Sequence, residues 1–371
     1  MKMPLLLEDL PFCLGAFDTP YNPSGLPAVL PFKIEIDLQS GMLSQVQDKK
    51  LDGILQKAYA VGALMGTPLS DSVLGIGYAE DFLNFIESKT AQKGRALEIG
   101  AGVGYISSQL KKAGWTIDSL EPGVGYEHYW KKYDVDVITE FFPSERARGP
   151  YNLIVAYAVM EHIADIERFL GDIKAHLTPA GIFILAVPDC TSEIMTGDPS
   201  MLLHEHFHYF NTSNLRRCLA KNGFNAKIGK AAYGRVLYAV SSVGVNIEVA
   251  VDVAEQEMLE SYPFRCRKLI SHVQTRLETA VASGSVGIYC PARALALLSR
   301  DYSLRFFDDA PELNGKYYPP FNNRISSRED LYHTPPDELW IMSRTFGKKI
   351  KRELMPNIPK TQVVLVEDLF E

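Results

Sequence analysis

A short apolar run followed by three closely spaced glycines constrains this chain more than any other feature. Residues 96–99 predict a buried strand, and Gly100, Gly102 and Gly104 predict a turn that leads into a helix over about residues 105–113. Glycine lets a backbone approach a ligand closely. The spacing Gly-x-Gly-x-Gly differs from the Gly-x-Gly-x-x-Gly fingerprint, which seats a pyrophosphate on a helix N-terminus. We therefore expect an α/β fold whose first turn holds a ligand other than a dinucleotide.

Acidic residues stand where two of the predicted strands end. Glu98 directly precedes the glycines, and a carboxylate at this point suits a cationic ligand better than a diphosphate. Glu121 follows a strand predicted at residues 115–120. A second carboxylate in that position could bind the hydroxyl groups of a ribose. The pair therefore favours a positively charged nucleoside as the ligand.

Two further strands, predicted at residues 151–156 and 181–187, continue the alternating pattern. The first runs into Val-Met-Glu-His-Ile at residues 159–163, ahead of an amphipathic helix predicted at 165–177. Taken together, the glycine loop, the second-strand acid and the Glu-His-Ile segment resemble those of the class I S-adenosylmethionine-dependent methyltransferases. The resemblance covers about residues 78–242 and implies a Rossmann-like domain with S-adenosyl-L-methionine as its cofactor.

The same resemblance implies a set of cofactor contacts at the carboxyl edge of the sheet. Tyr78, just ahead of a helix predicted at residues 81–88, would reach the methionine end of the cofactor; the alternative is an ordinary packed or surface tyrosine. Glu140 and Phe141 would flank the adenine after a strand predicted near residues 135–142, unless Phe141 and its neighbour belong to the core. The full set is Tyr78, Glu98, Gly100, Ala101, Gly102, Gly104, Glu121, Pro122, Glu140, Phe141, Ala158 and His162.

Three histidines alternate with other residues in the segment 204–210. On a strand, His204, His206 and His208 would line one face, and such a face can bind a transition metal. We expect no metal, because no other ligands cluster nearby in the sequence and methyl transfer needs none. A neutral imidazole can instead remove a proton from the attacking atom near pH 7, which makes His206 the candidate general base. The alternatives are that His206 only orders its loop, and that His162 supports a loop instead of touching substrate.

The surroundings of His206 are similar to the active-site segment of sugar C-methyltransferases, which carry Tyr-x-Glu-His ahead of an aromatic residue. The similarity implies that Glu205 and Tyr209 act with His206 in catalysis. Leu203 stands where that family has its tyrosine, so one hydroxyl group is missing and a carbon acceptor is in question. Related glycan O-methyltransferases also place a histidine and an aromatic residue here, ahead of a helix that ends in Gly-Phe, like residues 222–224.

The chain divides into three predicted domains. Residues 1–75 form an accessory domain similar to the zinc domain of sugar C-methyltransferases, but Asp-Leu-Gln-Ser-Gly at residues 37–41 replaces Cys-x-x-Cys-Gly, so we expect no structural zinc. Residues 76–243 form the methyltransferase domain, and residues 244–371 combine a helical connector with a smaller Rossmann-like α/β domain. Outside the methyltransferase domain, a helix is predicted at 49–65 and strands at 32–38, 285–290, 304–307, 338–342 and 362–366. Residues 247–282 predict a helical pair, because Pro263 would break or kink a single helix there.

The predicted C-terminal domain does not have the loop of a dinucleotide site. Its first strand is followed by Cys-Pro-Ala-Arg at residues 290–293, which lacks the glycines that let a diphosphate approach. The domain nevertheless resembles the C-terminal domain of the sugar C-methyltransferases, which helps to hold the nucleotide-sugar. Arg293 and Lys316 are its candidate phosphate or sugar contacts, although exposed basic residues usually have no specific ligand.

Composition excludes several classes of function. The formal net charge is −7 and basic residues occur only in short groups, which argues against a nucleic-acid partner. The five cysteines are scattered without a Cys-x-x-Cys pair, and no apolar stretch reaches the length of a membrane span. We therefore expect a cytoplasmic protein with a small-molecule substrate, acting alone or as a homo-oligomer.

The leading hypothesis is methyl transfer from S-adenosylmethionine to a nucleotide-linked sugar or a related small molecule. Two alternatives remain open: O- or N-methylation of a glycan or secondary metabolite, and a binding or scaffold protein that keeps the fold without catalysis. A nicotinamide-linked dehydrogenase is disfavoured by the spacing of the glycines.

Overall fold

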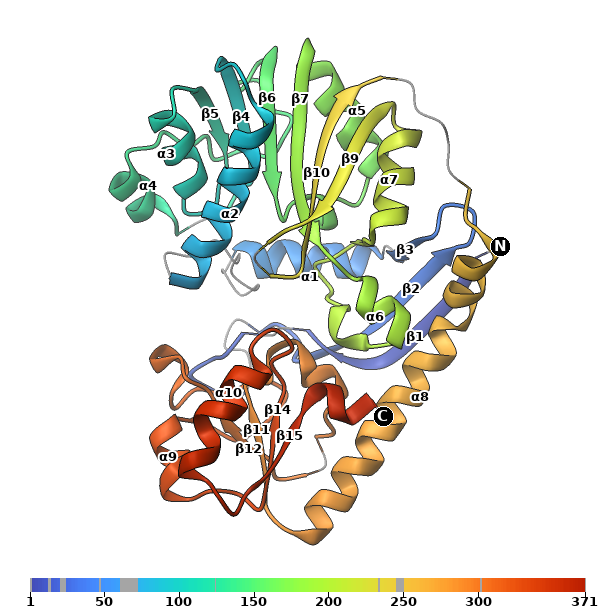
Figure 1. Ribbon diagram of the computed structural model, residues 1–371, viewed down its shortest axis with the longest axis vertical. Helices are drawn as coiled ribbons and strands as arrows, with labels where there is room; N and C mark the ends of the chain where they lie inside the picture. Colours follow the sequence, from blue (N-terminus) through green and yellow to red (C-terminus); the bar gives the residue numbers. More distant parts are fainter. Residues whose placement is uncertain are drawn as a thin grey trace.

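A computed structural model describes residues 2–12, 15–20, 25–46, 48–60, 73–123, 125–232, 234–244, 250–300 and 302–370. The strands of these residues form three sheets, one in the N-terminal region, one in the central region and one in the C-terminal region (Figure 1). One long helix runs along the side of the molecule and joins the upper and lower parts. Within the described ranges, no helix combines the length and the apolar character that a bilayer span needs.

The central sheet has six strands in the order β5-β4-β6-β7-β10-β9. The first four strands are parallel, and the last two join antiparallel. This is the predicted α/β arrangement, in which the carboxyl ends of parallel strands share one edge. The strands are β4 (Arg95–Ile99), β5 (Thr116–Leu120), β6 (Tyr151–Tyr157), β7 (Leu177–Pro188), β9 (Phe224–Lys230) and β10 (Val236–Val243). The helices are α2 (Val73–Lys89), α3 (Tyr105–Lys112), α4 (Glu127–Tyr133), α5 (Ile166–His176), α6 (Thr191–Thr196) and α7 (Thr212–Lys221).

Two local predictions for this domain need correction. The strand expected near residues 135–142 is reduced to a single bridge between Leu120 and Ile138. Helix α2 begins at Val73, so Tyr78 lies within the helix and not ahead of it. The apolar pattern of α2 starts eight residues before the predicted start at residue 81, and glycines at 75 and 77 hid it because glycine is a poor helix former.

The N-terminal sheet is completed by a strand from a distant part of the chain. Strands β1 (Lys2–Pro11), β2 (Val29–Asp37) and β3 (Met42–Gln45) are antiparallel, and β3 pairs on its other side with β8 (His208–Tyr209). The predicted strand at 32–38 falls in β2. The predicted helix at 49–65 begins as expected in α1 (Lys49–Ala60), and residues 61–65 lie outside the described residues.

The turn from β2 to β3 is closed by hydrogen bonds among its own residues. The Ser40 hydroxyl donates to the Asp37 carboxylate at 2.8 Å, and the backbone N–H of Gln39 donates to the same carboxylate at 3.0 Å. Gly41 has a φ of 70°, which favours glycine. These contacts order the turn that resembles a zinc knuckle. The absence of zinc there stays a prediction.

The predicted helical pair is wrong, because helix α8 (Val253–Ser283) runs unbroken through Pro263. The side chains of Ser261 and Arg265 donate to the carbonyl of Met258 in the turn before the proline. Packing on both halves keeps the helix continuous. Its first half contributes Tyr262 to the core under the N-terminal sheet, and its second half contributes to the core of the C-terminal domain.

The C-terminal domain is the predicted second Rossmann-like unit. Its five strands are all parallel, in the order β13-β12-β11-β14-β15. An ion pair between Arg344 and the buried carboxylate of Asp198 fixes this domain against the central one. The elements are β11 (Val286–Tyr289), β12 (Arg305–Phe307), β13 (Ile325–Ser326), α9 (Arg328–His333), β14 (Glu338–Ile341), α10 (Gly347–Leu354) and β15 (Gln362–Leu365).

Candidate functional site

The glycine loop follows β4 and has a backbone that only glycine adopts easily. Gly100, Gly102 and Gly104 have φ values of 75°, 50° and 81°, all in the left-handed region. The backbone N–H groups of Gly100 and Ala101 donate to the carbonyl of Leu120 at 2.8 and 2.9 Å, which ties the loop to the end of β5. The loop is thus a rigid turn that exposes backbone at the carboxyl edge of the sheet.

Glu121 contacts this loop directly. One carboxylate oxygen accepts from the N–H of Gly102 and the other from the N–H of Gly123, each at 2.7 Å. Trp130 donates to the carbonyl of Gly102 at 2.8 Å and holds the loop from the opposite side. A carboxylate can accept about four hydrogen bonds, so Glu121 keeps acceptor capacity for two hydroxyl groups. Its chemistry fits the ribose of a nucleoside bound at the loop, and Pro122 beside it is exposed.

Glu98 lies beneath the loop and not on the ligand face. Its side chain is 1% exposed and hydrogen-bonds to Ser107 in the first turn of α3, whose hydroxyl lies 2.6 Å from that of Ser119 in β5. Burial raises the pKa of Glu98 to about 8. Glu98 therefore does not lie where it would contact a cationic ligand directly, as was expected. It instead links α3 to β5 beneath the glycines.

The remaining candidate cofactor residues are divided between surface and core. Phe141 is 75% exposed and available to a ligand, whereas Phe142 packs against Phe169. The expectation that both phenylalanines are core is thus correct only for Phe142. Glu140 contacts Ser144 and lies 3.7 Å from Arg146.

Two further candidates for cofactor contacts are Ala158 and Tyr78. Ala158, at the end of β6, has a φ of 54°, which is unusual for a residue other than glycine. Tyr78 packs against Gly234, where an added Cβ would lie 2.2 Å from the tyrosine ring.

The three alternating histidines do not share one face, because only residues 208 and 209 form a strand. The ring of His204 packs edge-on against Phe32 at 5.1 Å. His208 lies 2.9 Å from the hydroxyl of Ser44 on the N-terminal sheet. His206 turns instead toward the loop after β6. The prediction of a common histidine face is therefore wrong, because residues 204–207 form a turn and not a strand.

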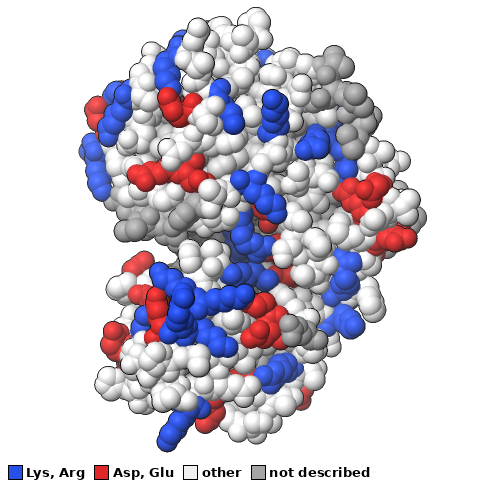
Figure 2. Space-filling view, in the orientation of Figure 1, with Lys and Arg blue, Asp and Glu red and all other residues white. Residues whose placement is uncertain are grey.

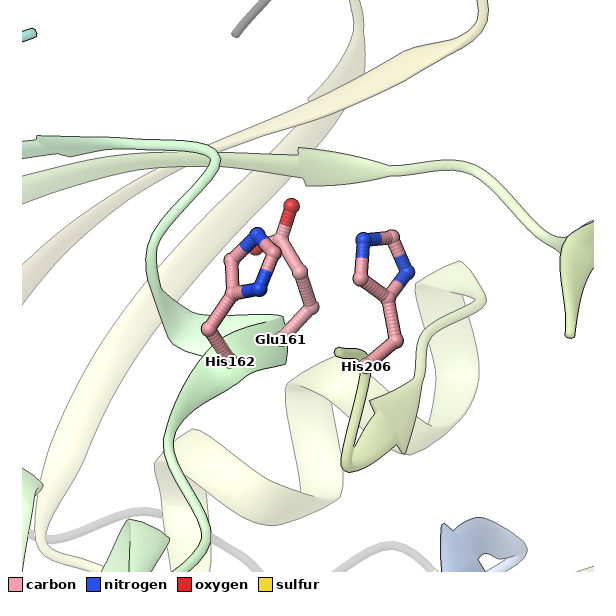
Figure 3. A group of neighbouring side chains, drawn as sticks. All are labelled: Glu161, His162 and His206. Atoms are coloured by element: carbon pink, nitrogen blue, oxygen red, sulfur yellow. The ribbon is translucent and has the colours of Figure 1, made fainter. Parts of the chain in front are cut away.

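His206 lies in a cluster with Glu161 and His162 (Figure 3). One ligand-type atom from each of the three side chains lies within 4.8 Å of the others. The two imidazole rings are nearly perpendicular, with centroids 4.7 Å apart. The expectation that no other such side chains lie near the histidines is wrong. In the sequence, Glu161 stands out only as part of the Glu-His-Ile motif. Its position before His162 does not indicate that its side chain is buried beside a second histidine.

Backbone contacts fix the two segments that carry this cluster. The N–H of Phe207 donates to the carbonyl of Glu161 at 2.7 Å, and the ring nitrogen Nδ1 of His162 lies 2.9 Å from the carbonyl of Glu205. The hydroxyl of Tyr209 is fully buried and donates to the carbonyl of Leu203 at 3.1 Å. Tyr209 therefore holds the loop that carries Glu205 and His206, and its hydroxyl does not reach the surface.

Burial sets the protonation states of the cluster. It lowers the pKa of His162 to about 4 and that of His206 well below its ordinary value, so both imidazoles are neutral at pH 7. It raises the pKa of Glu161 to about 8 and that of Glu205 to about 7. The positive charge of Arg293, from the C-terminal domain, acts on all four groups and lowers each pKa.

Arg293 thus brings charge from a second domain to this site. The face in Figure 2 is hollowed between the central and C-terminal domains, and Lys and Arg side chains gather along the hollow. No hydrogen bond or ion pair between described residues joins the side chain of Lys316 to the cluster. The structure therefore supports a place at the site for Arg293 but gives none to Lys316.

The glycine loop packs against the segment that leads into the histidine cluster. A Cβ added at Gly100 would lie 2.6 Å from Cγ2 of Val159, which stands two residues before Glu161. Both segments follow neighbouring parallel strands, β4 and β6. A ligand on the glycine loop and a molecule beside His206 would therefore meet at one edge of the sheet.

Comparisons with known proteins bear on this arrangement. Residues 75–227 match a family model described as a methyltransferase domain. The C-methyltransferase NovU of Streptomyces niveus is 21% identical over 309 residues, which span 73% of this chain and 74% of that protein. A ubiquinone biosynthesis O-methyltransferase of Rhodopseudomonas palustris (strain BisB5) is 26% identical over 102 residues, which span 25% of this chain and 39% of that enzyme. The solved Burkholderia thailandensis 1,6-didemethyltoxoflavin-N1-methyltransferase is 11% identical, with a TM-score of 0.41 over 55% of this chain and 96% of that one.

Proposed function

We propose that this chain, a class I methyltransferase that depends on S-adenosylmethionine, methylates a nucleotide-linked sugar or a related small molecule and uses His206 as its general base. One observation carries the proposal. A buried, neutral imidazole lies at the same sheet edge as the glycine loop, and the loop packs through Gly100 against Val159, two residues before the Glu161 that neighbours this imidazole. Donor and base are then close enough to serve one acceptor molecule.

The residues of the glycine loop would hold the donor. Gly100, Gly102 and Gly104 leave room for a nucleoside against the backbone, and Glu121 offers its remaining acceptor capacity to the ribose hydroxyls. Phe141 is exposed and could stack on the adenine. S-adenosylmethionine supplies a methyl group that the positive sulfonium already activates. The protein's main contribution is then alignment of donor and acceptor, which can lower a barrier by up to roughly 7–11 kcal/mol.

His206 would take the proton that the acceptor loses. Because burial keeps its imidazole neutral at pH 7, the ring is ready to accept a proton as the acceptor attacks the methyl carbon. Glu205 precedes it on the same loop and would orient it, while Tyr209 holds that loop in place. His162 packs perpendicular to the base and limits its rotation.

Two observations support the choice of acceptor. The similarity to a C-methyltransferase extends over 73% of this chain, well beyond the methyltransferase domain, whereas the similarity to an O-methyltransferase covers 25%. The positive charge of Arg293, from the C-terminal domain, acts on the cluster and would attract an anionic acceptor such as a nucleoside diphosphate sugar. Methylation of an oxygen or nitrogen is the second candidate, since Leu203 leaves the loop without the hydroxyl that would assist a carbanion.

Two measurements on one set of variants test the proposal. Calorimetry with S-adenosylhomocysteine should show micromolar binding to the wild type and to His206→Ala. Incubation with labelled donor and a panel of nucleoside diphosphate sugars, followed by mass measurement, should give a methylated product with the wild type only. His208→Asn, which changes a histidine outside the cluster, is the matched control. Wild-type turnover by His206→Ala would remove the base assignment, and the absence of product from every sugar would remove the acceptor class.

A further inference from the structure

Glu161 is the most unusual charged group near the site. Its side chain is 1% exposed, and its Oε2 has no hydrogen-bond partner among the described residues. Burying a carboxyl group without a partner is unfavourable, so native proteins rarely do it without a function. The methyl-transfer scheme above leaves this residue unused.

The position of Glu161 is fixed by the backbone. It belongs to the short turn Met160–His162 that follows β6, and its carbonyl accepts the N–H of Phe207 at 2.7 Å. Its carboxyl group lies within 4.8 Å of ligand-type ring nitrogens of both His162 and His206 (Figure 3). No hydrogen bond joins Glu161 to His206 in the described residues, so the carboxyl group and the imidazole would have to move closer for the pair to form.

We propose that Glu161 and His206 act as a proton-sharing pair, in which the carboxylate of Glu161 holds the imidazolium that His206 becomes during catalysis. The inference rests on the proposed role of His206 as the base. When the acceptor attacks, its electron pair would form the new bond to the methyl carbon, the carbon–sulfur bond of the donor would break with its electrons left on sulfur, and S-adenosylhomocysteine would leave. The acceptor's proton passes to one ring nitrogen of His206. The N–H on the other ring nitrogen then donates to the Glu161 carboxylate, so the pair changes from one negative charge to neutral overall. Glu161 acts through His206 and is therefore a positioning residue.

The three side chains are also of the types that bind transition metals, but the local charge argues against a cation. Arg293 places a positive charge that lowers the pKa of Glu161, His162 and His206. A second cation at the same point would be repelled. The single charge of an incoming proton is offset by the Glu161 carboxylate, whereas a divalent metal ion would leave the cluster positive, which favours the proton-sharing pair over a metal site.

Several groups face Glu161 and determine when it can act. These are Tyr157 at the end of β6, His162 and His206, Glu205 on the base loop, and Arg293 from the C-terminal domain. Burial raises the pKa of Glu161 to about 8, the negative charge of Glu205 raises it too, and Arg293 lowers it. The pair is competent only when Glu161 is ionised, so kcat should rise with pH around pH 8. The pKa of His206 lies well below neutral pH and does not set this rise.

The test is the pH profile of kcat, measured from pH 6 to 9.5 for the wild type and Glu161→Gln. The glutamine has the same size and cannot ionise, so the rise near pH 8 should disappear. At pH 9, kcat should fall by about 10²-fold, within the usual contribution of acid–base catalysis. KM and the affinity for S-adenosylhomocysteine should stay unchanged. A rise near pH 8 that survives in Glu161→Gln would overturn the proposal.

Two further measurements keep the inference separate from the proposed function. Arg293→Gln leaves Glu161 in place but removes the charge that lowers its pKa, so the midpoint of the rise should move to higher pH; an unmoved midpoint would contradict the pairing. This variant also serves if Glu161→Gln does not fold. Wild-type turnover by His206→Ala would sink the base itself, whatever Glu161 does. Purified enzyme that holds one transition metal per chain, with activity lost on chelation, would replace the pair with a metal site.

Discussion

Gly100 offers the sharpest test of how the glycine loop packs against the segment that follows β6. An alanine at this position would keep a backbone with a φ of 75°, which is unfavourable by roughly 1–2 kcal/mol for a residue with a side chain. Its Cβ would also lie 2.6 Å from Cγ2 of Val159, at least 0.8 Å closer than the 3.4 Å at which ordinary contact begins. Overpacking of this kind is unfavourable by about 1–3 kcal/mol. Gly100→Ala should therefore lower the free energy of unfolding by about 2–5 kcal/mol.

The two contributions can be separated with matched variants. Gly125→Ala has the same backbone problem, with a φ of 94°, but no atom lies within 4 Å of its added Cβ, so it should show only the strain of about 1–2 kcal/mol. Val159→Ala removes the methyl group that an alanine at 100 would meet. In a double-mutant cycle, the pair Gly100→Ala and Val159→Ala should recover about 1–3 kcal/mol relative to the sum of the single variants.

The assay is urea denaturation of the wild type and the four variants, with calorimetry of S-adenosylhomocysteine binding on each. Binding should weaken at least tenfold in Gly100→Ala, because about 1.4 kcal/mol of loop distortion already gives that factor. The double variant should regain part of this loss. Purely additive effects, with no recovery in the double variant, would refute the contact between Gly100 and Val159 and with it the packing of the glycine loop against the segment after β6.

Two other predictions concern buried charges. Burial raises the pKa of Glu98 from 4.5 to about 8, so the stability that its protonated form contributes is complete below pH 4.5 and is lost as pH rises through 8. As the pH rises through that window, the free energy of unfolding of Glu98→Gln, measured by urea denaturation, should therefore increase relative to that of the wild type by up to about 1.4 kcal/mol per pH unit. A difference between the two proteins that does not change with pH would contradict the raised pKa of Glu98. Arg217 forms a buried ion pair with Glu255 and donates to the carbonyl of Ser40 at 2.7 Å. Arg217→Ala should lower the free energy of unfolding by about 3–5 kcal/mol, and the double replacement Arg217→Met with Glu255→Leu should lower it much less; equal losses would show that the unpaired Glu255 charge is not the cause.

The parts of the fold that could be predicted from the sequence are those set by local chemistry. Gly100, Gly102 and Gly104 have the left-handed backbone that their spacing implied, and Glu121 contacts the loop as its place after a strand suggested. The fold class is confirmed by the order and direction of the strands in the central sheet, and the enzyme class by the methyltransferase match over residues 75–227. These features depend on a few neighbouring residues, so a single sequence contains them.

The errors arise where distant packing overrides a local pattern. Pro263 should break a helix, yet two separate cores and the side chains of neighbouring residues keep α8 continuous. The alternation of His204, His206 and His208 implied a strand, but tertiary contacts form a turn there. The motifs that contain Glu98 and Glu161 do not indicate whether either side chain supports a loop or faces a ligand. Only the three-dimensional structure shows what lies around a buried carboxyl group.

Strand β8 has a consequence for how the molecule is made. A ribosome releases residues 2–45 long before residues 208–209, which form the fourth strand of the same sheet. Helix α8, which covers that sheet with Tyr262, emerges later still. Residues 2–45 therefore stay incompletely covered until these later residues have been synthesised. Because β8 begins two residues after His206, the pairing that completes the sheet also fixes the end of the loop that carries His206.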